Sequence, residues 1–171
     1  MILPILIHPD PRLKKLCIPF ERIDEDAQAL GRAMLATMYD APGVGLAAPQ
    51  VGNLKRVFVM DCTEKEDEAT PMVLFNPTVT WVSEEENTHE EGCLSIPGMY
   101  EDVTRPAEVK VAFWDLEGKE REKHFNGLWA TCAQHEIDHL NGILFIDYLS
   151  RMKKSMITKK MQKLKKEQAS A

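Results

Sequence analysis

The chain has 171 residues, 44% of them hydrophobic, which is enough to fill one sizeable core, so we expect a single domain over residues 1–171. Its net charge of -6 argues against nucleic acid as the ligand of the whole chain. The four cysteines form no CxxC pair, and the opening MILPILI is too short to cross a bilayer or direct export. We therefore expect a cytoplasmic protein without membrane contact.

The first predicted helix follows Asp24, a residue type that caps helix N-termini well. Its apolar positions recur at helical spacing, at Ala27, Leu30, Met34 and Met38. The helix is expected to end before Pro42 and Gly43, because proline and glycine interrupt helices.

The middle of the chain contains short apolar runs that favour strands, at residues 57–60, 72–75 and 79–82. The acidic stretch 64–68 between the first two is expected to be a solvated loop. Further on, residues 109–113 and 120–125 flank a turn-forming segment and predict a β-hairpin.

Two more helices are predicted at the end of the chain. One extends from a cap at Asn126 to a stop at Asn141 and Gly142. The other begins after Ser150; residues 151–171 have a net charge of +7, which leaves -13 for the remainder. Its apolar stripe is expected to contain Met152, Met156, Met161 and Leu164. The order of elements predicts an α+β fold, with mostly antiparallel strands packed around the helix after Asn126 as the central helix, and with one helix at each end of the chain.

That central helix contains His135-Glu136-Ile137-Asp138-His139, an HExxH sequence. Residues four apart project from the same helical face, so the two imidazoles can bind one metal ion. Glu136 lies beside them, where it can hold a water molecule. A surface helix with two ordinary histidines is the alternative, but the apolar neighbours indicate a core helix, where uncompensated polar groups are costly.

A catalytic metal site usually has three protein ligands. In one large class of metalloproteases the third is a histidine further along the same helix, but Phe145 occupies that position here. A thermolysin-like site needs a downstream glutamate, and only Glu167 remains, in the lysine-rich terminal helix. The third ligand must then lie upstream, and the candidates are a carboxylate or one of Cys93, His8, His89 and His124. Cys93 is favoured because a thiolate binds iron or zinc strongly and glycine precedes it.

The segment Gly43-Val44-Gly45-Leu46-Ala47-Ala48-Pro49-Gln50 has the outline of a dinucleotide-binding turn, GxGxxA. That interpretation fails because the segment follows a helix rather than a strand, and Pro49 would interrupt the helix that such a turn opens. Glycine also serves where backbone lies against a ligand, and the amide of Gln50 is a donor that suits an oxyanion.

GVGLAAPQ at 43–50, EGCLS at 91–95 and HEIDH at 135–139 resemble the three signature motifs of the peptide deformylases, and they occur in the same order. The resemblance extends from HPDPRL at 8–13 to FIDYLS at 145–150. It implies a metal-dependent hydrolase that removes the formyl group from the N-terminal formyl-methionine of nascent polypeptides and releases formate. The alternatives are a zinc endopeptidase of the HExxH type and a catalytically silent metal-binding module.

The resemblance also implies roles for individual residues. It implies Cys93, His135 and His139 as ligands of one metal ion. It implies Glu136 as the acid and base, with Gln50 and the backbone N–H of Leu94 as oxyanion donors. Gly45 is placed with this catalytic group. The implied metal is Fe2+, for which Zn2+, Ni2+ or Co2+ can substitute.

A methionine side chain needs an apolar pocket beside the metal. The turns before His135 offer Leu128, Thr131 and Cys132, with Val44 opposite, and Gly92 is placed with this substrate-binding group. Leu128 and Cys132 could instead be ordinary core residues. Glu91 is expected to pair with Arg105.

The expected partners are N-formyl-methionyl peptides and a ribosome, which the basic terminal helix contacts. We expect the chain to be a monomer. Packing of that helix on the body without any ribosome contact is the alternative.

Overall fold

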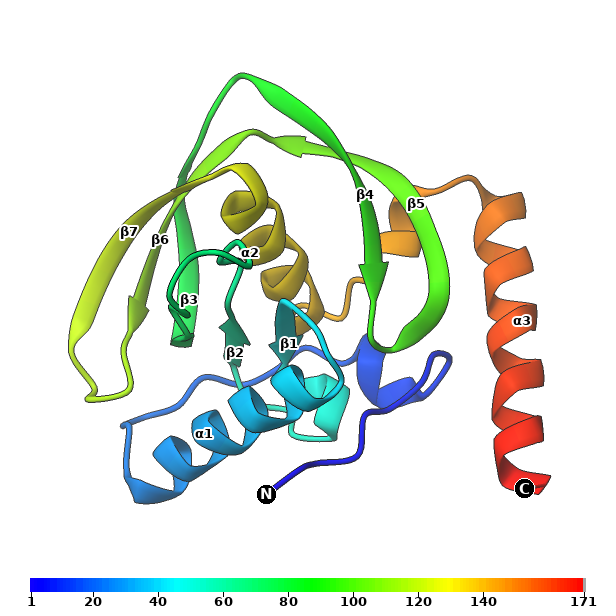
Figure 1. Cartoon of the computed structure of the whole chain (residues 1–171), viewed down its shortest axis with the longest axis horizontal. Coiled ribbons are helices and arrows are strands. Elements are labelled where there is room, and N and C mark those ends of the chain that lie inside the picture. Colours follow the sequence, from blue (N-terminus) through cyan, green and yellow to red (C-terminus); the bar gives the residue numbers. More distant parts are fainter. Residues whose placement is uncertain (171) are drawn as a thin grey trace.

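The computed structural model describes residues 1–170, in which one α-helix is followed along the chain by the strands and then by two more α-helices (Figure 1). The α-helices are α1 (Glu25–Asp40), α2 (Gly127–Leu140) and α3 (Arg151–Ser170). The strands are β1 (Gly45–Ala47), β2 (Val57–Met60), β3 (Met72–Val82), β4 (Glu86–Cys93), β5 (Ile96–Pro106), β6 (Glu108–Trp114) and β7 (Glu120–Asn126). Short 3-10 helices cover Pro11–Lys14, Ala48–Val51 and Phe145–Tyr148.

The strands form two antiparallel sheets. One has the order β1-β2-β3-β6-β7, and the other is the long hairpin of β4 and β5. In Figure 1 this hairpin curves beside α2, which lies in the middle of the molecule. The predicted α+β class, with mostly antiparallel strands around the helix that carries HExxH, is therefore confirmed.

The side chains of β2 alternate between two buried clusters, one on each face of the larger sheet. Phe58 and Met60 belong to a buried cluster that includes the apolar face of α2. Val57 and Val59 belong to a second cluster that includes Met34 and other residues of α1. Successive side chains of a strand point to opposite faces, so each face of β2 covers a different helix. All four residues of β2 are fully buried, which fixes α2 firmly on the sheet.

Several predicted boundaries differ from the structure. The two strands expected at 72–75 and 79–82 are one strand, β3, whose pairing with β6 is irregular between Phe75 and Thr78 and again after Val79. Pro77 lies in the first irregular stretch, which is consistent with its missing N–H. The predicted hairpin of β6 and β7 is present. Strands β4 and β5 were not predicted, because most of their residues are polar.

The terminal helix packs through a stripe that matches the predicted one in part. Met152 and Met156 are 80% and 52% exposed, so the prediction was wrong for these two residues. Met161 is buried as predicted, together with Ile157, in a third cluster with Leu13, Phe145 and Ile146, and Leu164 is partly buried against that cluster. The Nε2 atom of His8 lies 2.8 Å from the hydroxyl of Thr158 and adds a polar contact. Ala171, the last residue of the predicted helix, lies outside the described residues.

Among residues 1–170, every helix is too short or too polar to cross a bilayer.

Candidate metal centre

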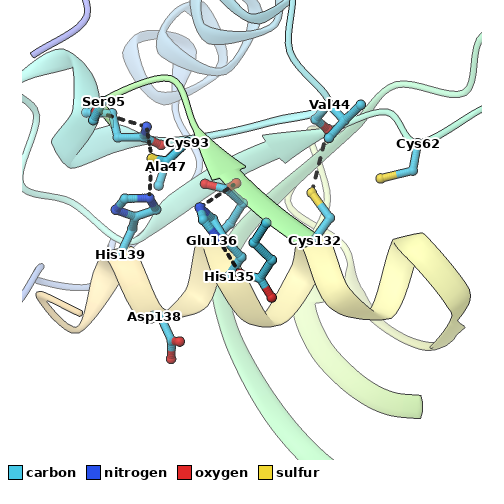
Figure 2. Close-up of polar contacts among 12 residues, drawn as sticks. Val44, Ala47, Cys62, Cys93, Ser95, Cys132, His135, Glu136, Asp138 and His139 are labelled. Carbon is cyan, nitrogen blue, oxygen red and sulfur yellow. Dashed lines mark hydrogen bonds and ion pairs between the residues drawn. The ribbon is translucent and has the colours of Figure 1, made fainter. Parts of the chain in front are cut away.

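Helix α2 presents the chemically important side chains on the face that turns toward the β-strands. Figure 2 shows His135, Glu136 and His139 on this face and Asp138 on the opposite side. His135 and His139 are separated by about one helical turn, and their ring centroids are 5.0 Å apart. All three side chains are at least nine-tenths buried. The helix ends at its C-cap Asn141, as predicted, although the Asn126 side chain makes no capping hydrogen bond.

Cys93 reaches these histidines from the last position of β4. One ligand atom each from Cys93, His135 and His139 lies within 4.8 Å of the others. The Cys93 Sγ atom is 3.3 Å from Nε2 of His139. Within the described residues, Nδ1 of His139 is buried without a hydrogen-bond partner. A thiolate and two imidazole nitrogens are a suitable donor set for zinc or iron, and three ligands leave a position for water, so these residues fit a catalytic metal ion.

The other upstream candidates lie elsewhere. His8 contacts Thr158 on α3, and His124 lies on β7, 2.6 Å from Glu108. Among residues 1–170, neither they nor His89 belong to a group of potential metal ligands. Of the four named candidates, Cys93 is therefore the one that belongs to a potential ligand group with His135 and His139.

A hydrogen-bonded network of charged side chains orients the imidazole ring of His135. Its Nδ1 atom is 2.9 Å from Oε1 of Glu91, which leaves Nε2 directed away from that carboxylate. Arg105 holds Glu91 through two hydrogen bonds of 2.7 and 3.0 Å, so the expected pairing of these residues is confirmed. A third contact of 2.8 Å joins Arg105 to Asp138, which also accepts a hydrogen bond from Tyr148. Burial alone would raise the pKa of Glu91, but hydrogen bonds from His135 and Arg105 lower it to about 2.

We expect Glu91→Gln to weaken metal binding by roughly 10-fold to 100-fold, the usual cost of losing an outer carboxylate partner of a ligating histidine. The amide keeps the shape of Glu91 but removes the charge that fixes the His135 tautomer. Competition with a chelator measures the change, and Glu86→Gln, at an exposed position of the same strand, is the control. Equal metal affinity in the two variants would contradict this role.

Glu136 lies beside the three potential ligands. Its Oε2 atom is 4.0 Å from Nε2 of His135, and within residues 1–170 its Oε1 atom has no hydrogen-bond partner. Burial raises the pKa of this carboxyl to about 7. A carboxyl group with such a pKa can both accept and donate a proton near neutral pH. Glycine at position 45 leaves room for the Glu136 carboxylate, since an added Cβ there would lie only 2.6 Å from the Oε2 atom.

The buried side chain of Gln50 also contacts Cys93. Its Oε1 atom accepts a hydrogen bond of 2.9 Å from the N–H of Ala47, which fixes the direction of the amide. Its Nε2 atom donates to Ser95 Oγ at 3.1 Å and to Cys93 Sγ at 3.4 Å. Because Gln50 is 1% exposed, its amide is a rigid donor next to the candidate ligands. Leu94, in the turn between β4 and β5, lies next to Cys93 in sequence.

A pocket of about 660 Å³ opens onto this group. Every predicted substrate-binding residue lines it, namely Val44, Gly92, Leu128, Thr131 and Cys132. Leu128 is 48% exposed at the pocket and is not a core residue. Gly92 has a packing role as well, because an added Cβ would overlap the ring of Tyr100.

Sequence reasoning missed several residues that the fold brings to the site. Ser95 binds the Gln50 amide, and Ile5 and Tyr100 line the pocket. The contact of Glu91 with His135 was also missed. Its position two residues before Cys93 could have indicated it, although the pairing of β4 with β5 is irregular between these two residues.

An HExxH helix, an additional thiol, a buried carboxyl with a pKa near 7 and an adjoining pocket define a metal-dependent hydrolase. The comparisons with known proteins narrow this class. The family model described as polypeptide deformylase matches residues 2–155. A peptide deformylase of Rhizobium meliloti (strain 1021) is 52% identical over 165 residues, which are 96% of this chain and 95% of that protein.

Solved structures agree. A peptide deformylase from Ehrlichia chaffeensis superposes with a TM-score of 0.94 at 35% identity, covering 99% of each chain. One from Legionella pneumophila gives a TM-score of 0.91 at 46% identity, covering 100% of this chain and 99% of that one. The chain belongs to the polypeptide deformylase family. It is a metal-dependent hydrolase that removes the formyl group from nascent chains, and the endopeptidase and silent-module alternatives are not favoured.

Proposed function

We propose that Cys93, His135 and His139 bind one Fe2+ ion and that Glu136 is the acid and base of the deformylation. The observation that carries this proposal is the convergence of the three ligand atoms within 4.8 Å, beside a carboxyl whose pKa burial raises to about 7. When bound, the divalent ion supplies Lewis acidity that activates water near neutral pH and polarises the formyl carbonyl.

The residues of the chain perform the proton transfers and stabilise charge. Glu136 accepts the proton of the attacking water and later returns it to the leaving amine nitrogen, so that formate and a free N-terminal methionine are released. The Gln50 amide and the Leu94 N–H donate to the oxygen on which negative charge develops. Gly45 leaves room for the Glu136 carboxylate, because any side chain there would collide with it.

The pocket residues bind the substrate, an N-formyl-methionyl peptide. Val44 and Leu128 supply apolar surface, while Thr131 and Cys132 form part of the α2 wall of the pocket. Gly92 brings the backbone of β4 against the ligand. These contacts favour a long, flexible apolar side chain such as methionine.

Anaerobic purification, metal analysis and a formate-release assay on a formyl-Met dipeptide test this proposal. We expect about one iron per chain and activity that falls in air as the ferrous ion oxidises. On the usual affinity order a Cys/His/His set binds Zn2+ more tightly than Fe2+, so metal supply determines what is loaded, and Zn2+, Ni2+ or Co2+ can substitute. A protein that binds no divalent metal, or a metal-loaded protein without formate release, would overturn it.

We further propose that α3 contacts ribosomal RNA, where formylated chains emerge. One face of α3 packs on the body through Ile157 and Met161, while most of its lysines remain exposed. Packing and RNA binding thus use different faces of the helix.

The four cysteines carry free thiols, which supports a cytoplasmic location. We also expect a monomer with one catalytic domain over residues 1–171.

The triple variant Lys159→Gln, Lys160→Gln and Lys163→Gln removes exposed charge from α3 without touching its buried stripe. We expect weaker ribosome binding and a shallower dependence on salt, because fewer phosphate contacts release fewer counterions. Co-sedimentation with ribosomes at several salt concentrations measures both. The matched control replaces the exposed Lys65, Lys119 and Lys123 with glutamine. Equal binding of the two triple variants would eliminate the proposed contact and leave packing as the role of α3.

A further inference from the structure

Two buried cysteines beside the site have no role in the proposed chemistry. Cys62, just after β2, is 6% exposed, and Cys132, on α2, is 5% exposed. Both belong to the buried cluster between the larger sheet and α2. Their sulfur atoms lie side by side in Figure 2, and each carries a free thiol.

Backbone contacts hold these two thiols together from both elements. The Cys132 Sγ atom is 3.7 Å from the Val44 carbonyl oxygen, which also accepts a hydrogen bond of 2.9 Å from the N–H of Asp61. The Cys62 Sγ atom is 4.0 Å from the carbonyl oxygen of Leu128, one helical turn before Cys132. Hydrogen bonding to Cys62, followed by burial, raises the pKa of the Cys132 thiol. Cys62 thus contacts the helix that carries Cys132, and Cys132 contacts a carbonyl that is hydrogen-bonded to the residue before Cys62.

One of the two cysteines borders the substrate pocket. Cys132 lines this pocket and is 5% exposed, so a small oxidant that enters the pocket comes next to this residue. Cys62 is absent from the pocket wall and lies in the same buried cluster as Cys132. A cysteine at the pocket with a second thiol in the cluster beside it suits disulfide formation in two steps.

We propose that Cys62 and Cys132 form a reversible disulfide that controls substrate entry in response to hydroperoxides. The Cys132 sulfur attacks one peroxide oxygen as its thiol proton is lost, and the O–O bond breaks. That proton and the departing hydroxide form one water, and a sulfenic acid remains on Cys132. The Cys62 thiol then attacks that sulfur and displaces a second water. Two thiols lose two electrons and two protons to hydrogen peroxide, and a dithiol or phosphine reductant reverses the change.

The cross-link alters the pocket because Cys132 also supports its opposite wall. A disulfide turns the Cys132 sulfur toward Cys62 and removes its S–H donor from the Val44 carbonyl. An added Cβ on Gly45 would lie 2.6 Å from this sulfur, so the sulfur already touches the neighbouring backbone. Val44 and Gly45 line the pocket, and their displacement changes how the formyl-Met end binds. The expected kinetic result is a raised KM.

Peptide mapping of the zinc-loaded holoenzyme after hydrogen peroxide treatment tests the cross-link directly. Trypsin places each cysteine in a separate peptide, with Cys62 in 57–65, Cys132 in 124–151 and the candidate ligand Cys93 in 66–110. We expect 57–65 to be joined to 124–151 and to separate on reduction. Because this readout is a mass, it does not depend on the catalytic roles proposed above. Absence of the joined peptide would overturn the proposal.

Activity of the same samples tests the control of substrate entry. We expect kcat/KM of the unmodified chain to fall at least fivefold, mainly through KM, and to return on reduction. Cys62→Ala should resist the treatment, with Cys62→Ser as a second variant if alanine impairs folding. Cys17→Ala, at a buried cysteine outside the pocket, should respond like the unmodified chain.

Two further outcomes would show that the disulfide does not control substrate entry. In one, the disulfide forms without any change in kcat/KM. In the other, Cys62→Ala and the unmodified chain lose activity equally, with the oxidation located in peptide 66–110.

Discussion

Replacement of Glu136 by alanine is expected to lower kcat by about 10³-fold or more while the metal stays bound, a loss in the range that general acid–base groups contribute. The carboxylate lies 4.0 Å from Nε2 of His135 but is not one of the three potential ligands. Its removal deletes the group that transfers the proton and leaves the donor set intact. Metal analysis and steady-state formate release on the same preparation separate the two effects.

Glu136→Gln sharpens this test, because the amide keeps the volume of the side chain but cannot accept a proton. We expect it to be nearly as inactive as the alanine variant. Glu120→Gln, at an exposed carboxylate on β7, is the matched control and should have normal activity. Substantial turnover by metal-loaded Glu136→Ala protein would exclude Glu136 as the essential acid and base.

Replacement of Gln50 by alanine is expected to cost on the order of 3 kcal/mol of transition-state stabilisation, which is about a 100-fold loss in kcat. The amide is held in place at both ends, by the Ala47 N–H and by Ser95, so its donor is preorganised. An interaction that strengthens only as charge develops changes kcat more than KM. Steady-state kinetics on a formyl-Met dipeptide measure both constants.

Gln50→Glu tests the sign of the interaction, because the near-isosteric carboxylate places negative charge where the oxyanion develops. We expect it to be at least as inactive as Gln50→Ala. Gln134→Ala is the control, since Gln134 lies on the same helix as Glu136 but hydrogen-bonds to the carbonyls of Ala130 and Pro106. Unchanged kcat in Gln50→Ala would refute an oxyanion role, provided that metal content is equal.

Local patterns predicted the elements that have strong periodicity. The apolar spacing of α1 and α2, and the turn between β6 and β7, reflect contacts between residues close in sequence. Strands β4 and β5 lack such a pattern, since much of each strand is polar and exposed. Their register depends on pairing with each other and on the buried contact of Glu91 with Arg105. Half of the predicted stripe of α3, Met152 and Met156, was wrong for a related reason, because the apolar residues of a lysine-rich helix are compatible with several faces.

The sequence by itself determined that His135 and His139 share one helical face, with Glu136 beside them, because a four-residue spacing is a local property of any α-helix. Together with two other motifs it also indicated the polypeptide deformylase family. Only the tertiary structure decided that Cys93 lies 3.3 Å from His139, across 46 positions, and that Gln50 reaches Cys93 across 43. Such distances follow from how β4, β5 and the sheet pack around α2, and no local periodicity encodes that packing. The proximity of Cys62 to Cys132 arises in the same way, from the contact of the end of β2 with the middle of α2.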